Sequence, residues 1–398
     1  MFGISMWLLQ QVKRIGYEKV HFAARDGFYL KRIYDLICEK TGGSKTNSNY
    51  LYISRKSMIP VEINNKNFVD RILTSCIFSS NTPKTIINRY CSILEPLTEE
   101  LVAKYKAAGF FMEKIFQNED EFAVFINTLK LYQFSEEKAE RNYKVCREYL
   151  TEQVGKNDLI FDLGYSGKLH QYVVEALGKN VAGAYINMEG YNAIRRIDKY
   201  SLVINSYYDF IPSMEGIVNE FIFSDRIPSC VGYVKECSGI IPVFEEKADD
   251  YIGDYVVNEI NRGAYKFAEE FMKFFGKRMD IIKFQPLDAS ILYESFLAKP
   301  KSFDQSVFDG CVIEDEFYGG IKRKQLNEIW NWQRNERKLD GRGYAEAEYT
   351  DNVYGNLKYE VYLQNVHKRN LIIKGLYWLC VDKEFFKKRL LEHIRKDK

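Results

Sequence analysis

The chain has 398 residues, of which 46% are hydrophobic and 28% charged, a composition typical of a soluble globular protein with room for two domains. Its formal net charge is only +2, so no net field favours binding to nucleic acid or to anionic lipid. The eight cysteines form no C-x-x-C motif and only four histidines are present, which argues against a structural zinc site. With no signal-peptide pattern and no apolar run long enough to cross a bilayer, we expect a reduced, cytoplasmic protein without a transmembrane segment.

The first half of the chain alternates between helical and strand patterns. A helical rhythm from Phe2 to about Gly16 precedes an apolar run at 19–24. Further strands are predicted at 50–53, 158–162 and 181–186, and the predicted helices run from about 28 to 39, through most of 66–155, and over 168–177. Short apolar strands that alternate with helices predict a parallel sheet covered on both faces, which is a Rossmann-like α/β fold.

Beyond about residue 190 helical patterns dominate. They fall near 214–224, 251–275, 288–297, 322–335 and 371–396, with short strands expected around 231–234 and 240–243. The sequence therefore predicts a Rossmann-like domain at 1–190 with a helical insertion at about 66–155, followed by a mainly helical lobe at 191–398. A single interlocked unit is the alternative.

The segment 158–168 carries the most specific chemistry. A buried strand ends at Asp162, and Gly164, Ser166 and Gly167 form a tight loop before a helix that begins at Lys168. Glycines let backbone N–H groups approach an anion, and a helix N-terminus adds partial positive charge. The loop is not a P-loop, because Asp162 and Leu169 stand where Gly and Ser or Thr are needed.

Two other predicted strands end in polar clusters. Arg25, Asp26 and Gly27 follow the first strand, and Arg55 follows the second. The carboxyl ends of parallel strands share one sheet edge, so we expect these residues beside Asp162. Arginines and a glycine loop suit a phosphate, while the two aspartates could bind a divalent metal such as Mg²⁺ or act on a hydroxyl. Alternatively, Arg25 and Asp26 pair to cap the edge, and Arg55 anchors a loop.

Two histidines and one glutamate complete the set of titratable groups considered for the site. His170, in the first turn after the loop, could reach a ligand, whereas His21 lies inside a strand and is expected to pack in the core. Glu220 is an acid among apolar neighbours, so partial burial would raise its pKa and make it a candidate acid or base; an exposed helix face is the alternative.

In order and spacing, several motifs make residues 1–320 similar to the C-terminal region of bacterial predicted hydrolases of the HAD superfamily, which are associated with surface-polysaccharide and glycosyltransferase gene clusters. These motifs are His21–Gly27, Tyr50–Arg55, Phe161–Gly167, Asn219–Ser224 and, more loosely, Phe296–Pro300. The D-x-D-x-[TV] segment that supplies the catalytic aspartates of HAD phosphatases does not occur here. In the family it lies in a domain upstream of the matched region.

From these features we expect an enzyme of surface-polysaccharide assembly that binds a phosphorylated sugar or nucleotide-type ligand, with transfer or hydrolysis open. Arg25, Arg55 and Lys168 would neutralise the phosphate. One alternative is a metal-dependent, HAD-like phosphatase with a non-standard aspartate. Another is a non-catalytic partner of a glycosyltransferase or of a separate HAD-domain protein.

Overall fold

The computed structural model describes residues 1–331 with gaps at 42–46, 65–67, 77, 165, 189–202, 209–215, 247–249, 280–281, 283, 285, 299 and 316–320. The helix predicted at 371–396 lies outside the described residues.

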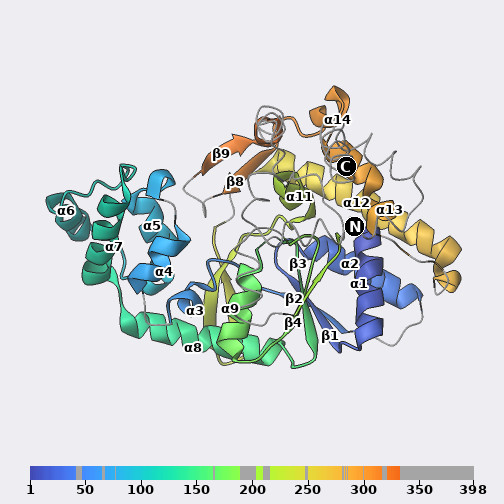
Figure 1. The fold of residues 1–398 in the computed structure, drawn as a ribbon, viewed down its shortest axis with the longest axis horizontal. Coiled ribbons are helices and arrows are strands. Elements are labelled where there is room, and N and C mark those ends of the chain that lie inside the picture. The colour runs from blue at the N-terminus through green and yellow to red at the C-terminus, as the bar shows by residue number, and fades with distance from the viewer. Residues whose placement is uncertain are drawn as a thin grey trace, which may run out of the picture.

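A five-stranded parallel sheet forms the centre of the molecule, with the strand order β2-β1-β3-β4-β5 (Figure 1). Its strands are β1 (Lys19–Ala23), β2 (Asn47–Leu51), β3 (Asp158–Asp162), β4 (Ala182–Tyr185) and β5 (Ile204–Ser206). The chain adds β2 on one side of β1 and then β3 on the other. This reversal is the topological switch point of a doubly wound sheet, and it confirms the predicted Rossmann-like α/β fold.

Helices cover both faces of this sheet. On one face α1 (Phe2–Ile15) and α2 (Phe28–Lys40) share an apolar core with Phe22 and Phe161. On the other, α8 (Glu136–Gln153) and α9 (Lys168–Leu177) pack with Ile160. The central strands β1, β3 and β4 are almost entirely buried, because helices cover both faces of the sheet there. The edge strand β2 begins at Asn47, earlier than predicted, because this polar stretch pairs with β1 from Lys19 onward.

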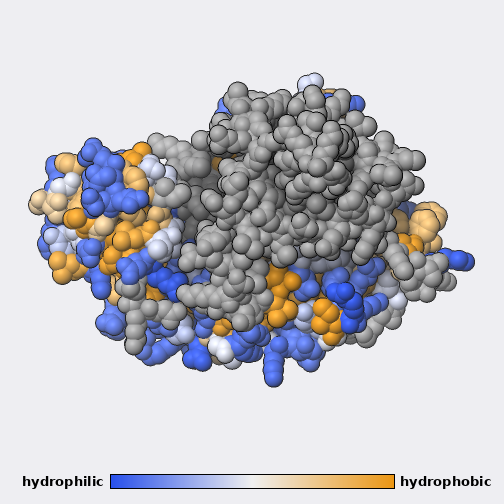
Figure 2. Space-filling model, viewed as in Figure 1, coloured by the Kyte–Doolittle hydropathy of each residue, from blue (hydrophilic) through white to orange (hydrophobic). Residues whose placement is uncertain are grey.

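The predicted helical insertion is present between β2 and β3, and it begins at Ile59 rather than near residue 66. Its elements before α8 are α3 (Ile59–Ile63), α4 (Phe68–Ser75), η1 (Phe78–Ser80), α5 (Pro83–Arg89), η2 (Cys91–Ile93), α6 (Glu99–Ala107) and α7 (Glu119–Gln133). A separate aromatic core that includes Phe68, Tyr105 and Phe125 holds these helices together. The outer surface of the insertion mixes apolar and polar side chains (Figure 2).

The region after the sheet combines helices with two antiparallel hairpins. The helices are α11 (Gly216–Phe223), α12 (Tyr251–Phe275), η3 (Gly276–Arg278), α13 (Pro286–Ala298) and α14 (Ser302–Ser306), and the hairpins are β6 (Cys230–Glu236) with β7 (Gly239–Phe244) and β8 (Val312–Asp315) with β9 (Ile321–Gln325). The strands expected around 231–234 and 240–243 are therefore confirmed. The helix predicted at 322–335 is wrong over 322–325, because these residues pair with β8.

The sheet and the C-terminal region share one apolar core. It joins Leu8 of α1 and Phe161 of β3 to Val257 of α12 and to Trp330. Strand β5, which follows residue 190, also belongs to the main sheet. These two observations favour the interlocked unit over a boundary near 190. Among the described helices, none has the length and apolar character to span a bilayer.

Candidate functional site

Two aspartates lie on either side of the topological switch point. Asp162 is the last residue of β3, and Asp26 lies in the turn that follows β1, the parallel neighbour of β3. In doubly wound sheets, ligands bind outside the carboxyl ends of the strands at this point. The edge predicted from the sequence is therefore the edge at which the fold places ligand sites.

A tight turn places Asp26. The N–H of Gly27 donates to the carbonyl of Ala23 at 2.8 Å, and a Cβ on Gly27 would lie 2.7 Å from the Cβ of Phe22. No side chain fits at this close approach. The N–H of Asp225, just beyond α11, donates to the carbonyl of Arg25 at 3.0 Å and fixes the turn from outside.

A second turn presents Arg55 after β2. The N–H of Ser54 donates to the hydroxyl of Ser57 at 2.9 Å, and the N–H of Ser57 donates back to the hydroxyl of Ser54 at 3.1 Å. The hydroxyl of Ser54 also donates to the carbonyl of Cys230 in β6. The partly exposed Arg55 lies within electrostatic range of both Asp26 and Asp162, since its charge acts on the pKa of each.

The C-terminal region adds polar groups from α11 and the residues that follow it. The hydroxyl of Ser224 donates to a carboxylate oxygen of Asp26, and the charge of Glu220 contributes to the pKa of Asp162. The side-chain amide of Asn261 holds the end of α11 by donating to the carbonyl of Ile222 at 3.1 Å. Sequence reasoning does not single out Ser224, although this residue closes the motif Asn219–Ser224.

Burial dominates the electrostatics of the two aspartates. It raises the pKa of Asp162 to about 7, with further contributions from the charges of Asp26 and Glu220, while the Leu163 N–H and Arg55 oppose the rise. Burial also raises the pKa of Asp26, against the hydrogen bond from Ser224 and the charges of Arg25 and Arg55. At neutral pH a large fraction of Asp162 is therefore protonated and able to donate a proton.

The glycine loop follows directly from Asp162, whose carboxylate accepts a hydrogen bond from the N–H of Leu163 at 2.8 Å. A Cβ on Gly164 would lie 2.7 Å from the carbonyl oxygen of Asn187, so the loop rests against the chain that leaves β4. Gly167 is the N-cap of α9 and, having no side chain, makes no side-chain capping hydrogen bond. The first N–H groups of the helix lack intrahelical partners. Ser166 is partly exposed beside them.

Two residues that the sequence predicts to bind a ligand, His170 and Lys168, have other partners in the structure. His170 is buried, with Nε2 2.6 Å from the carbonyl oxygen of Val181, and burial lowers its pKa to about 4. The prediction that His170 reaches a ligand is therefore corrected to a neutral, packed residue. Lys168 forms an ion pair with the buried Glu62, at 3.0 Å between Nζ and Oε1, so its charge is already matched. His21 packs in the core as expected, with Nε2 2.7 Å from Asp158.

The described residues contain no group of three or more His, Cys, Asp or Glu side chains arranged to hold a metal ion. Mg²⁺ commonly binds through only one or two carboxylates together with ligand phosphates. Asp26 and Asp162 would be the carboxylates for such a mode.

The fold and the site define a doubly wound α/β protein with a mixed acidic and basic site at its topological switch point. In comparisons with known proteins, no family model and no curated sequence matches this chain. The function must therefore be argued from the geometry of the site.

Proposed function

We propose that this protein binds a phosphorylated sugar or nucleotide-type ligand at the carboxyl edge of β1, β2 and β3. The observation that supports this most is the presence of Arg55 within electrostatic range of both Asp26 and Asp162 at the switch point. The exposed Arg25 would meet the outer phosphate oxygens, and the N-terminus of α9 would add backbone donors.

The chemistry at this edge would be transfer to, or hydrolysis of, the phosphorylated ligand. Asp162, with its pKa near 7, would give a proton to the leaving oxygen, while Asp26 would orient a hydroxyl. As the alternative to this proton-donor role, an ionised Asp162 together with Asp26 would hold a Mg²⁺ that offsets phosphate charge. The resemblance to predicted HAD-superfamily hydrolases associated with surface-polysaccharide gene clusters motivates a role in surface-glycan assembly in the cytoplasm, with a glycosyltransferase or a HAD-domain protein as partner.

A thermal-shift screen tests the binding proposal. Sugar phosphates, nucleotide sugars and phosphoribosyl pyrophosphate would each be added with and without Mg²⁺. We expect at least one class to raise the melting temperature of the wild type and to lose this effect in Arg25→Ala and Arg55→Ala. Stabilisation that is the same in all three proteins would contradict the proposed site.

A second candidate function, a phosphatase, is favoured by the unequal surroundings of the two aspartates. Burial raises the pKa of both aspartates, but at Asp26 the Ser224 hydrogen bond and the charges of two arginines oppose the rise, whereas the pKa of Asp162 reaches about 7 and about half of this carboxyl is protonated at neutral pH. The carboxylate of Asp26 would attack phosphorus, Asp162 would protonate the leaving oxygen, and water would hydrolyse the acyl phosphate. Phosphate release that disappears in both Asp26→Asn and Asp162→Asn would support this candidate, and release unchanged in either variant would exclude it.

A further inference from the structure

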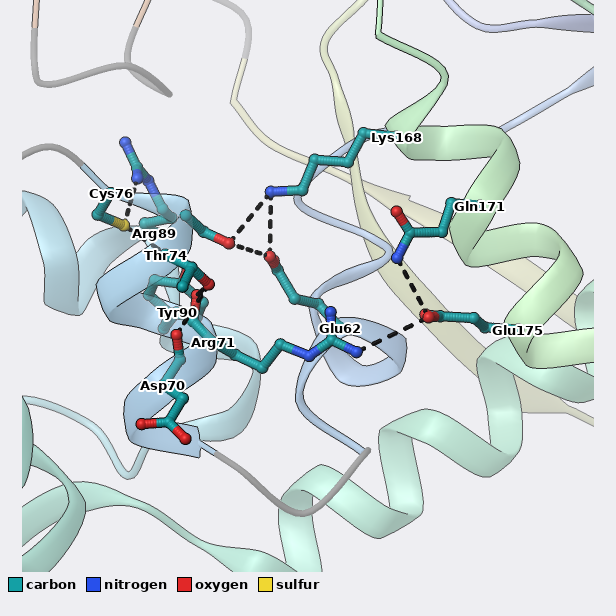
Figure 3. Close-up of polar contacts among 11 residues, drawn as sticks. Glu62, Asp70, Arg71, Thr74, Cys76, Arg89, Tyr90, Lys168, Gln171 and Glu175 are labelled. Atoms are coloured by element: carbon teal, nitrogen blue, oxygen red, sulfur yellow. Dashed lines mark hydrogen bonds and ion pairs between the residues drawn. The ribbon is translucent and has the colours of Figure 1, made fainter. Parts of the chain in front are cut away.

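Two ion pairs connect the helical insertion to α9 (Figure 3). Lys168 Nζ lies 3.0 Å from Glu62 Oε1 of α3, and Arg71 Nη2 of α4 lies 3.7 Å from Glu175 Oε1. Lys168 and Glu175 are seven residues apart, about two helical turns, so both lie on the same face of α9. The insertion therefore holds α9 near both of its ends.

Glu62 is the more deeply buried anchor, with a side chain only 1% exposed. Its Oε1 also accepts a hydrogen bond from the hydroxyl of Ser75 at 2.6 Å, and Lys168 donates to the same hydroxyl at 3.3 Å. Burial alone would raise the pKa of Glu62, but Lys168 and Ser75 bring it below its ordinary value. The pair is thus ionised at neutral pH, and loss of either partner leaves a buried charge uncompensated.

The position of Lys168 gives this pair its significance. Lys168 is the first residue of α9 and follows directly on the loop formed by Gly164, Ser166 and Gly167. On the other side of the loop, Gly164 lies so near the carbonyl oxygen of Asn187 that an added Cβ would be 2.7 Å from it. The Glu62–Lys168 pair thus holds the first residue of α9 directly after the loop.

We propose that Glu62 is a positioning residue, which holds the glycine loop and the start of α9 in the arrangement that receives the anion. The insertion thereby becomes part of the ligand-binding unit. Because Glu62 already matches the charge of Lys168, this lysine positions the loop and is not assigned to the phosphate charge. The ligand-binding half of this inference rests on the proposed function, whereas the anchoring of the loop does not.

Hydrogen exchange without ligand tests the anchoring. Glu62→Gln keeps the shape of the side chain and removes its charge. The matched control, Glu113→Gln, removes an exposed ion pair with Lys84 on the same insertion. We expect amides of residues 163–171 to exchange at least tenfold faster in Glu62→Gln, and at the wild-type rate in the control, with the β6–β7 hairpin unchanged in both. Equal loop exchange in all three proteins would overturn the proposal.

Two further measurements separate the possible failures. Titration with inorganic phosphate and glucose 1-phosphate should give dissociation constants at least fivefold weaker in Glu62→Gln than in the control. If the wild type binds no phosphorylated compound, the proposed function fails while the exchange result still decides the anchoring. Faster exchange with unchanged affinity would overturn the ligand-binding half. Should Glu62→Gln not fold, Ser75→Ala retains both charges and should accelerate loop exchange to a smaller extent, and no acceleration would overturn the anchoring.

Discussion

Asp26 and Asp162 lie on either side of the junction between β1 and β3, and the charge of Asp26 contributes to the raised pKa of Asp162. The fold produces this arrangement because Asp162 ends β3, Asp26 lies in the turn after β1, and these parallel strands are neighbours at the switch point. Burial raises the pKa of Asp162 to about 7, so about half of this carboxyl is protonated at neutral pH, and Arg55 lies in electrostatic range of both aspartates. The site can thus offer a proton donor and positive charge at the same edge.

The raised pKa of Asp162 predicts a pH-dependent effect of Asp162→Asn on stability. Between the ordinary pKa near 4 and the folded pKa of about 7, the folded state keeps a proton that the unfolded state has lost, so wild-type stability falls as the pH rises through this window. Asparagine does not titrate. We therefore expect that, between pH 5 and pH 8, the free energy of unfolding of the wild type falls by about 2–3 kcal/mol relative to that of the variant.

Urea denaturation at both pH values measures this difference. Glu113→Gln, at an exposed position, is the control and should parallel the wild type. An Asp162→Asn curve that also parallels the wild type would show that Asp162 titrates near its ordinary value.

Gly27→Ala should destabilise the protein through steric overlap. The added Cβ would meet the Cβ of Phe22 at 2.7 Å and the carbonyl oxygen of Ala23 at 2.8 Å, and neither atom belongs to a flexible side-chain end. We expect a loss of about 1–3 kcal/mol in the free energy of unfolding. Gly232→Ala, where no atom lies within 4 Å of the position that the added methyl group would take, is the matched control. Equal losses in the two variants would refute the close approach at Gly27.

Lys168→Met should be among the more destabilising single substitutions, because it leaves the carboxylate of Glu62 buried without its cation. Losses of about 3–5 kcal/mol accompany the removal of one partner from a buried ion pair. The double variant Glu62→Gln with Lys168→Met leaves no such charge and should recover part of the loss. Denaturant unfolding at pH 7 of the single and double variants provides the comparison, and a double variant as unstable as Lys168→Met would contradict this explanation.

Much of the fold can be predicted from the sequence because its local patterns are strong. The apolar run of β3 and the 3.6-residue rhythm of α12 each specify one element. Pairing between distant segments is harder to predict. Residues 322–325 have a helical pattern, yet their partner β8 makes them a strand, and the polar start of β2 becomes a strand only through its pairing with β1.

The sequence predicts which residues meet at the site where these residues lie at the ends of strands. Asp26, Arg55 and Asp162 share one edge because parallel strands must end together. The partners of long side chains do not follow from that rule. The sequence pattern assigns Lys168 to a phosphate, although Glu62, more than 100 residues earlier in the chain, pairs with it. The prediction for His170 is wrong for a similar reason, because proximity to the loop in sequence says nothing of which way its ring packs.

The most direct test of the proposed site is calorimetric titration of the best phosphorylated ligand from the thermal-shift screen into wild type, Arg55→Ala and Arg147→Ala. Arg147 is an exposed arginine of α8 and serves as the control. We predict that Arg55→Ala weakens binding by about 10- to 100-fold, as expected for loss of a charged hydrogen bond worth about 1.5–3 kcal/mol, and that Arg147→Ala binds like the wild type. Equal affinity in Arg55→Ala and the wild type would contradict a ligand site at the switch point.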